Sequence, residues 1–477
     1  MGLSVNFISY EFLVFFAIVA GIYWLLTQRQ QNWMLLVASY IFYGWWDWRF
    51  LSLLLLSSLV DFSCGLLLAS RKSSLIRKIV LAASIATNVG FLATFKYFDF
   101  FSNTLQRCLS TVGIDINLPV LNIILPVGIS FYTFQTLSYT IDVYRRRLEA
   151  TNRLADFMLF VSFFPQLVAG PIERASNLLP QILGERQFSL TMAKSGVQLA
   201  AVGFFKKMVV ADNLAILVNA VYRNSNSDGL TVLLATYAFA FQIYCDFSGY
   251  TDIARGISRT LGFDIRENFR LPYFATTPSE FWQRWHISLS AWLRDYLYIP
   301  LGGNRGGNYA TLRNLALTML LGGLWHGASL QFVAWGAYQG ALLISFRSFS
   351  RDSSGQTAQV PSRGVTFWIK VFAYFQLTCY GWLIFRARGI TGAFDFTLSL
   401  VSLWEWRWDA IDFVISYQLI ILVLPLLVTQ VYQYYKDDME PWSKWPVITQ
   451  TLLFIALIYA TILLGATEQS EFIYFQF

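Results

Sequence analysis

The feature that most constrains this chain is the recurrence of apolar runs about as long as a bilayer is thick. A helix that crosses a membrane needs about 20 consecutive, mostly apolar residues. Runs close to this length predict spans at residues 9–26, 33–47, 50–69, 77–98, 119–141, 195–222, 231–248, 310–325, 328–346, 365–387, 412–433 and 447–466. Lipid offers no hydrogen-bond partners to the backbone, so these runs predict helices and an all-α integral membrane protein.

Composition agrees with this interpretation. Of the 477 residues, 56% are hydrophobic and 13% are charged, whereas soluble domains have about 25% charged residues. We therefore predict one transmembrane domain over residues 1–477. The net charge of +7 does not indicate nucleic-acid binding, because Lys and Arg accumulate in the cytoplasmic loops of membrane proteins.

Cysteine and histidine usage argues against a metal site. The chain has no C-x-x-C pair and only two histidines, and its cysteines are scattered at Cys64, Cys108, Cys245 and Cys379. Zinc and iron–sulfur sites need clustered ligands of these types. We expect neither a metal nor a permanently bound cofactor.

Basic loops predict the orientation. Lys and Arg cluster at residues 71–78 and 145–153, and placing both clusters in the cytoplasm puts the N-terminus and the loop 99–118 outside. Pro165, Gly170 and Pro171 interrupt the apolar segment 154–172, which we interpret as a re-entrant element, since protein or a watery cavity must satisfy such a backbone. An ordinary kinked span is the alternative, and it would invert everything downstream.

Two further stretches have no membrane-crossing run. Residues 249–309 are rich in arginine and acidic residues, so we predict a cytoplasmic-side interfacial region that leads to a helix break near residue 326. Residues 350–364 have the composition of a flexible loop.

Both histidines, His286 and His326, fall in or near this region. Histidine has an unperturbed pKa of about 6.5, so it exchanges protons near neutrality. Any proton transfer by imidazole must therefore use one of these two residues.

The first histidine lies in a predicted helix. Thr277-Pro278-Ser279-Glu280 has the form of a capping box with proline at the first helical position, and the helix should run to about Tyr298 before Pro300. Its Trp and Leu residues share one face, and His286 lies beside that stripe, where it can point into a polar groove. A structural histidine bonded to a loop carbonyl is an equally open reading.

The turn that follows contains Asn304, Arg305 and four glycines within residues 301–308. Such a backbone can expose donors to an anion, although a flexible turn with a topology-setting arginine is the simpler reading. The arginines of residues 255–305 can hold donor phosphates or merely set topology.

His326 gives the sharper hypothesis. It stands between two apolar runs, next to Gly322, Gly323 and Gly327. Glycines permit a helix break or close backbone approach, and ionisable residues at membrane depth are costly and usually functional. A histidine in an apolar site tends to stay neutral, as a general base must. A packing histidine between helices is the alternative.

Other acyl-transfer motifs are absent from the sequence. It has no G-x-S-x-G elbow for a serine nucleophile, and neither histidine is followed by the aspartate of an H-x-x-x-x-D motif.

Around both histidines and in several other motifs, the chain resembles the membrane-bound O-acyltransferase (MBOAT) family, in particular its bacterial alginate O-acetyltransferase branch. The resemblance covers nearly the whole length and several motifs in the same order. They are Pro165–Ile172, Tyr244–Tyr250, Phe281–Pro300, the Leu-Gly-Gly-Asn-Arg turn at 301–305, Leu321–Ala328 and the tail Phe472–Phe477.

This resemblance implies an MBOAT-type arched ring of about 11–12 tilted transmembrane helices, with re-entrant and interfacial helices around a central tunnel. It implies that His326 is catalytic at the narrow part and that His286, nearer the cytoplasm, supports catalysis. The residues expected to bind substrate or donor are Arg284, Trp285, Arg294, Asn304, Arg305 and Trp325.

The function we expect is transfer of an acetyl group from a cytoplasmic donor, acetyl-coenzyme A (acetyl-CoA) or a carrier acylated from it. The acceptors would be hydroxyls of an extracytoplasmic, alginate-like exopolysaccharide, reached directly or through extracytoplasmic acetyltransferase partner proteins at the bacterial inner membrane. One alternative is acyl or D-alanyl transfer to peptidoglycan or teichoic acid. Another is a non-catalytic transporter of the acyl donor, although we see no internal symmetry of the kind transporters often show.

Overall fold

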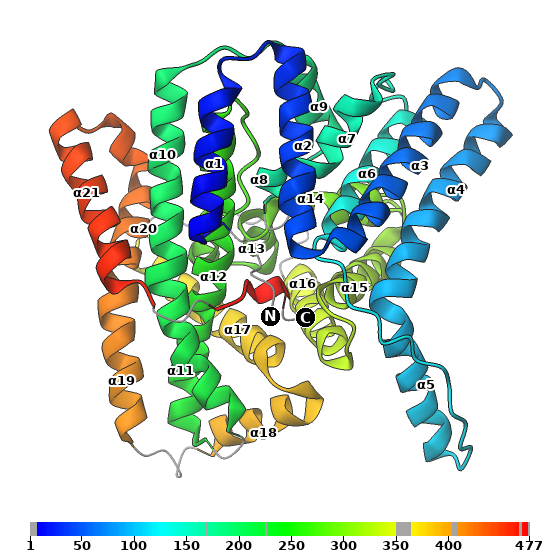
Figure 1. Ribbon diagram of the computed structural model, residues 1–477. Coiled ribbons are helices and arrows are strands. Elements are labelled where there is room, and N and C mark those ends of the chain that lie inside the picture. Colours follow the sequence, from blue (N-terminus) through cyan, green and yellow to red (C-terminus); the bar gives the residue numbers. More distant parts are fainter. Residues whose placement is uncertain are drawn as a thin grey trace. The chain divides into compact units, whose positions relative to one another are not determined.

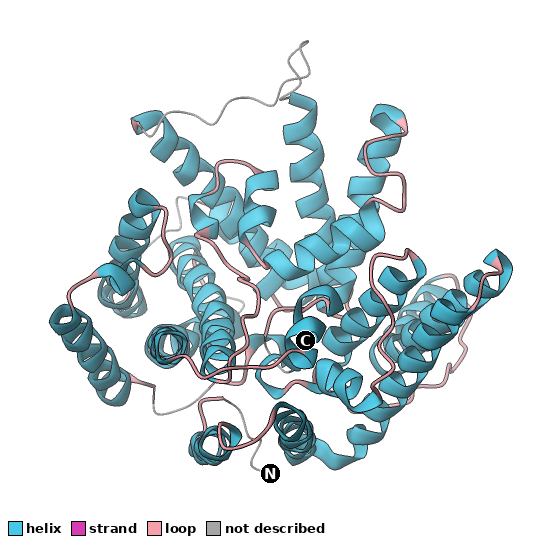
Figure 2. Cartoon of the chain, turned by 90° about the horizontal axis from the view of Figure 1, so that it is seen from above, coloured by secondary structure: helices cyan, strands magenta, loops and turns pink. Residues whose placement is uncertain are grey.

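A computed structural model describes residues 7–167, 170–224, 227–349, 364–402, 408–466 and 470–475. Helices and loops account for these residues, and no strand occurs among them (Figure 2). The prediction of an all-α membrane protein is confirmed. The predicted flexible loop 350–364 lies, apart from Gly364, outside the described residues.

Five helical stretches in the described ranges are long and apolar enough to cross a bilayer. They are Gln28–Ser70, Ser74–Thr111, Gly229–Thr260, Ala410–Lys436 and Val447–Leu464. The total of about 11–12 spans and their arrangement around a tunnel stay predictions.

The helices pack into two compact units. Unit 1 contains Met1–Ala200 and Ile253–Arg266, and unit 2 contains Ala201–Asp252 and Glu267–Phe477. Each unit therefore draws on two stretches of the chain, and a single domain over residues 1–477 stays a prediction.

Unit 1 begins with long helices close to the predicted spans. They are α1 (Tyr10–Tyr23), α2 (Gln28–Asp47), α3 (Leu51–Ser70) and α4 (Ser74–Leu92), which continues through a π-helical turn (Ala93–Tyr97) into α5 (Phe98–Thr111). A short 3-10 turn at Trp48–Phe50 joins α2 to α3, and the two helices run in opposite directions (Figure 1). The apolar stretch 28–70 thus forms two helices separated by this turn.

The predicted span 119–141 is wrong at its start. Residues 114–126 have no regular structure, and helix α6 covers Ile129–Tyr144. Pro119 and Pro126 lack the backbone donor that a helix needs, and Gly128, at the N-cap, has φ +76°. The predicted outer loop 99–118 also contains most of α5.

The segment predicted to be re-entrant is broken. Phe163, which is not helical, separates α7 (Leu154–Ser162) from α8 (Phe164–Leu167). The break is buried, and the Phe164 N–H donates to the Ser39 hydroxyl at 3.1 Å, so protein satisfies the interrupted backbone as expected. The unpredicted helix α9 (Ala175–Leu183) follows. The re-entrant course of residues 154–172 through a membrane stays a prediction.

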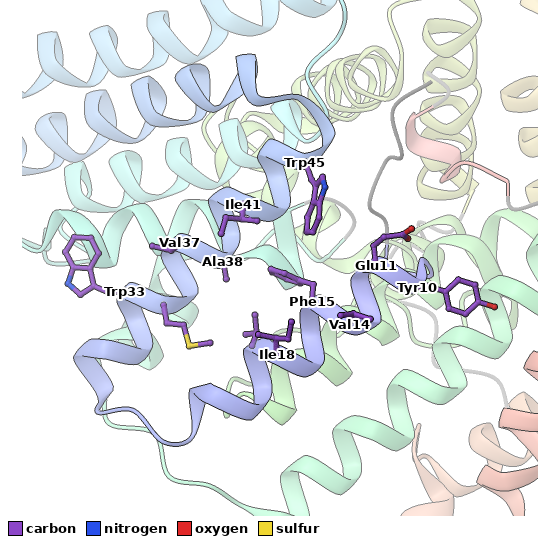
Figure 3. Close-up of a pocket in the computed structure, with 12 residues that line it drawn as sticks. Tyr10, Glu11, Val14, Phe15, Ile18, Trp33, Val37, Ala38, Ile41 and Trp45 are labelled. Carbon is purple, nitrogen blue, oxygen red and sulfur yellow. The ribbon is translucent and has the colours of Figure 1, made fainter.

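Helices α1 and α2 enclose an apolar groove of about 820 Å³ (Figure 3). Its walls include Val14, Ile18, Val37 and Ile41, and Glu11 is the single charged residue among those that line it. Such walls match hydrocarbon chains and bring no reacting groups together, so this groove is not the candidate active site.

Helix α12 (Gly229–Thr260) runs well past the predicted span 231–248. Buried Ile253, Ala254 and Ile257 continue its apolar face at helical spacing, although charged neighbours end the hydropathic run. Residues 249–260, predicted as the start of an interfacial region, are therefore the end of this helix, and the interfacial location of the residues that follow stays a prediction. Helix α10 (Leu190–Phe204) continues through a π-helical turn (Phe205–Ala211) into α11 (Asp212–Arg223).

The rest of unit 2 consists of short helices around the first histidine and longer helices from residue 307 onward. The longer ones are α15 (Gly307–His326), α16 (Leu330–Phe349), α17 (Val365–Arg386), the unpredicted α18 (Gly389–Val401), α19 (Ala410–Gln418), α20 (Leu424–Lys436) and α21 (Val447–Leu464).

Helices α15 and α16 form a tight hairpin that positions His326. A Cβ atom added at Gly323 would collide with the Phe332 carbonyl oxygen and the Gly336 Cα atom. Their backbones therefore touch, which only glycine allows. This contact brings the end of α15, where His326 lies, against Trp335 on α16.

Candidate active site

His326 is the last residue of α15, and aromatic rings surround it. The residue is 5% exposed. The imidazole centroid lies 5.0 Å from those of Trp325 and Trp335, 5.4 Å from Tyr474 and 5.6 Å from Phe385. The second histidine thus occupies a largely apolar, aromatic site.

The helix predicted from Thr277 to Tyr298 starts as expected. The Thr277 hydroxyl accepts a hydrogen bond from the Glu280 N–H at 3.2 Å, with Pro278 at the first helical position. The Glu280 carboxylate accepts from the Thr276 N–H at 2.8 Å, one residue before the partner that a capping box prescribes.

The prediction of one continuous helix is wrong. The segment divides into α13 (Pro278–Arg284), α14 (Ile287–Leu293) and a π-helical turn at Arg294–Tyr298. His286 occupies the N-cap of α14 in the left-handed conformation, with φ +42° and ψ +55°. The neighbouring loop replaces the missing helical bonds, because Ile287 N–H donates to the Asn268 carbonyl oxygen at 3.0 Å.

Hydrogen bonds determine the tautomer of His286. The Oδ1 atom of Asn268 accepts from the Ser288 backbone N–H at 3.1 Å, so it is the amide oxygen. The same oxygen lies 3.1 Å from His286 Nδ1. Two acceptors cannot pair, so Nδ1 carries the proton and Nε2 presents its lone pair.

The Nε2 atom of His286 has no hydrogen-bond partner within the described part of the chain. The residue is fully buried, with its ring 4.7 Å from Phe247. Aromatic surroundings replace the predicted polar groove, and the polar contacts of Nδ1 are the Asn268 amide and the Ser288 hydroxyl. His286 lies outside the candidate membrane spans. Burial lowers the pKa of its imidazole well below 6.5, and the nearby His326 acts in the same direction. The ring is therefore a neutral base at pH 7.

Two aromatic side chains contact both histidines. The Trp325 ring lies 6.0 Å from His286 and 5.0 Å from His326. The Tyr474 ring lies 6.2 Å and 5.4 Å from the same two imidazoles. Trp325 was predicted as a site residue. Tyr474 and Asn268 were not, although the tail motif at 472–477 marked the neighbourhood of Tyr474.

A cavity of about 390 Å³ leads to the second histidine. Its lining includes His326, Trp282, Trp335, Tyr298 and Arg294. The Arg294 side chain is 64% exposed, whereas His326 is buried, so the cavity connects solvent-accessible surface with the imidazole. His286 is not among the lining residues of this cavity.

The remaining predicted donor-binding residues differ in their distance from this cavity. Arg294 lines it and pairs with Asp295 at 2.7 Å. Asn304 does not line the cavity, but it accepts a hydrogen bond from the hydroxyl of Tyr298, which does. Arg305 lies in the exposed turn before α15. All three residues fall within residues 294–305, and Arg294 is the one among them that lines the cavity.

Arg284 and Trp285 do not line the cavity. Arg284 pairs with Glu280 at 2.9 Å and donates to the Arg270 carbonyl oxygen at 3.2 Å. Trp285 is 1% exposed and packs in the core, with its ring 4.8 Å from Trp382. Donor binding by either residue stays a prediction.

The arrangement suits proton transfer by imidazole. Among the described residues no group of three His, Cys, Asp or Glu side chains could hold a metal ion. The two imidazoles lie in aromatic surroundings, and an imidazole there, such as that of His326 at the end of the cavity, can accept a proton from a hydroxyl that attacks a carbonyl carbon.

Comparisons with known proteins agree with this chemistry. Residues 41–384 match the model of the MBOAT, membrane-bound O-acyltransferase, family. A protein of Azotobacter vinelandii named "Probable alginate O-acetylase AlgI" is 37% identical over all of both chains. Its namesake in Pseudomonas putida is 36% identical over 97% of this chain and 98% of its own length. A "Peptidoglycan O-acetyltransferase" of Helicobacter pylori is 33% identical over 77% of this chain and 73% of its own length. The chain is a multi-pass membrane O-acyltransferase that belongs to the membrane-bound O-acyltransferase family.

Proposed function

We propose that this protein transfers acetyl groups from cytoplasmic acetyl-CoA to hydroxyls of an extracytoplasmic, alginate-like polysaccharide at the bacterial inner membrane. The observation that carries the proposal is the cavity that joins the exposed Arg294 to the buried His326. The names of the Azotobacter and Pseudomonas relatives support alginate as the acceptor.

In the proposed reaction His326 is the general base. It takes the proton of the acceptor hydroxyl while that oxygen attacks the acetyl carbonyl carbon. The carbon–sulfur bond then breaks, and the proton passes from the imidazole to the departing sulfur, so that free thiol and acetyl ester result. His286, neutral and held by Asn268, sits beside this step and supports it through their shared neighbours, Trp325 and Tyr474.

The acceptor hydroxyl can belong to the polymer itself or to an extracytoplasmic acetyltransferase partner that completes the transfer. Both versions use the same bond changes at His326. They differ in where the acetyl ester first appears, on the polysaccharide or on a partner protein.

Reconstitution tests the proposal. Proteoliposomes containing the purified protein receive acetyl-CoA labelled in the acetyl group, with alginate and a periplasmic extract on the opposite side. We expect free thiol together with label in base-labile ester on alginate or on a partner protein. Label on peptidoglycan or teichoic acid instead would reassign the acceptor. Label that crosses the bilayer without any thioester cleavage would identify a transporter and refute the proposal.

Arg294 provides a prediction about donor binding. An arginine that holds a donor phosphate contributes a charge-assisted hydrogen bond of about 1.5–3 kcal/mol. We expect Arg294→Ala to raise the KM for acetyl-CoA about tenfold with little change in kcat, which is the signature of lost uniform binding. Thiol release at varied acetyl-CoA concentration measures both constants.

Lys444→Ala is the matched control for Arg294→Ala. Lys444 pairs with Asp438 at 2.6 Å and its side chain is 76% exposed, but it does not line the cavity. Equal KM values for the two variants would show that Arg294 does not contact the donor.

A further inference from the structure

A buried cluster of charges lies outside the histidine pair in unit 2. Lys207 Nζ is 2.7 Å from Asp212 Oδ1 and 2.6 Å from Asp246 Oδ1. The three side chains are between 0% and 4% exposed. Buried charges are tolerated when they are paired and fully hydrogen-bonded. One ammonium group faces two carboxyl groups here, and their remaining oxygens need further donors.

The C-terminal segment 470–475 binds to this cluster. The Ile473 N–H donates to Asp246 Oδ2 at 2.8 Å, and Lys207 Nζ donates to the Ser470 carbonyl oxygen at 2.9 Å. Both bonds use the backbone of the segment, so the cluster fixes its path rather than one side chain. It is joined at two points three residues apart.

Aromatic contacts hold the same segment from α12. The Phe472 ring lies 4.7 Å from Tyr250 and 5.5 Å from Phe247. Phe247 also lies 4.7 Å from Tyr474. Two sequence motifs that are more than 200 residues apart, at 244–250 and 472–477, therefore meet at this point.

Tyr474 follows directly after the fixed residue Ile473. Its ring contacts the imidazoles of both His286 and His326. A shift of the segment would therefore change the wall that the two histidines share. We propose that Asp246, together with Lys207, is a positioning residue of the acyl-transfer site: it fixes residues 470–475 so that Tyr474 stands against both imidazoles. This inference rests on the function proposed above.

Two substitutions at Asp246 separate this role from a general effect of charge. Asp246→Leu and Asp246→Asn both remove one negative charge and leave Lys207 paired with Asp212. The asparagine keeps an oxygen that can accept from the Ile473 N–H, and the leucine does not. The assay is thiol release from acetyl-CoA with alginate present. We expect Asp246→Leu to lower kcat on the order of 10- to 100-fold, because the Tyr474 side chain would be displaced from the two imidazoles. We expect Asp246→Asn to stay within about fivefold of the unchanged protein, since the backbone bond persists.

The neighbouring pair Lys206–Asp252 gives a matched control. Lys206 Nζ lies 2.7 Å from Asp252 Oδ2, both side chains are 13% exposed, and the ammonium lies over the Tyr244 ring. We expect Asp252→Leu to reduce the amount of folded protein while its kcat per folded molecule changes less than about threefold.

A double-mutant cycle with Tyr474 completes the test. If Asp246 acts through Tyr474, the variant with both Asp246→Leu and Tyr474→Ala should lose no more activity than the worse single variant. Losses that multiply would overturn the proposal, as would an equal loss in Asp246→Leu and Asp246→Asn or full activity of Tyr474→Ala. Activity that survives in His326→Ala would refute the proposed function itself. An inactive His326→Ala combined with multiplying losses refutes only the role of Asp246.

Discussion

Replacement of His326 by alanine is expected to reduce acetyl transfer on the order of 1,000-fold or more. A positioned general base contributes about 10²- to 10⁴-fold to a rate. Trp325 and Trp335, which pack against His326, carry no group that could replace it as a base. Thiol release from acetyl-CoA and ester formation on alginate should fall together, while the protein remains monodisperse in detergent.

His326→Gln distinguishes chemistry from packing. Glutamine has a similar volume and keeps hydrogen-bonding atoms, but it is not a base near pH 7. Both variants should be equally inactive if imidazole takes the proton. Full activity of His326→Gln would mean that this residue only fills space between α15, α16 and α17.

His286→Ala is expected to lower kcat about 100-fold. The neutral ring presents Nε2 to the aromatic site, and Asn268 holds it in that tautomer. Asn268→Leu keeps the imidazole but releases the tautomer, so its loss should be smaller, about tenfold. Circular dichroism and thermal melting of each purified variant check that the break at residues 285–286 persists. An Asn268→Leu variant less active than His286→Ala would contradict this order.

The same residue predicts the pH profile. Burial keeps the pKa of His286 well below 6.5, so the ring stays neutral as the pH falls from 8 to 6. Activity that depends on neutral His286 should therefore hold through this interval. An exposed imidazole would instead lose activity as the pH falls through about 6.5.

Local sequence patterns predicted the main features of the fold for clear physical reasons. Apolar runs located α1 to α4, α15 to α17 and α21, because their length and hydrophobicity are set by the bilayer itself. The Thr277-Pro278 start was also readable, since cap and first-turn residues act within one turn of helix. The same local patterns singled out His326, Trp325 and the glycines around them, and their role in the site stays a prediction.

Features that depend on distant contacts were not readable. The break at His286 arises because Asn268, from another segment, supplies partners for Nδ1, Ile287 N–H and Ser288 N–H. The apolar stripe predicted for this segment continues without interruption and gives no sign of the break. Likewise, the place of Tyr474 depends on the bond between Ile473 and Asp246, which joins residues 227 positions apart.

Helix α12 extends beyond its predicted span for a different reason. Hydropathy falls after residue 248 because Asp252, Arg255 and Arg259 enter the sequence. The helix nevertheless continues, since Ile253 and Ile257 remain buried on one face. A hydropathy window measures the average around the helix, and only the periodicity reports the buried face.

His286 has a left-handed backbone conformation, which lowers the stability of the folded chain. A side chain other than glycine in this conformation costs about 1–2 kcal/mol. Glycine at position 286 would relieve that cost and remove the imidazole. Stability alone would therefore favour the inert residue. Under the proposed function, the histidine at this strained turn gives up stability in exchange for catalysis.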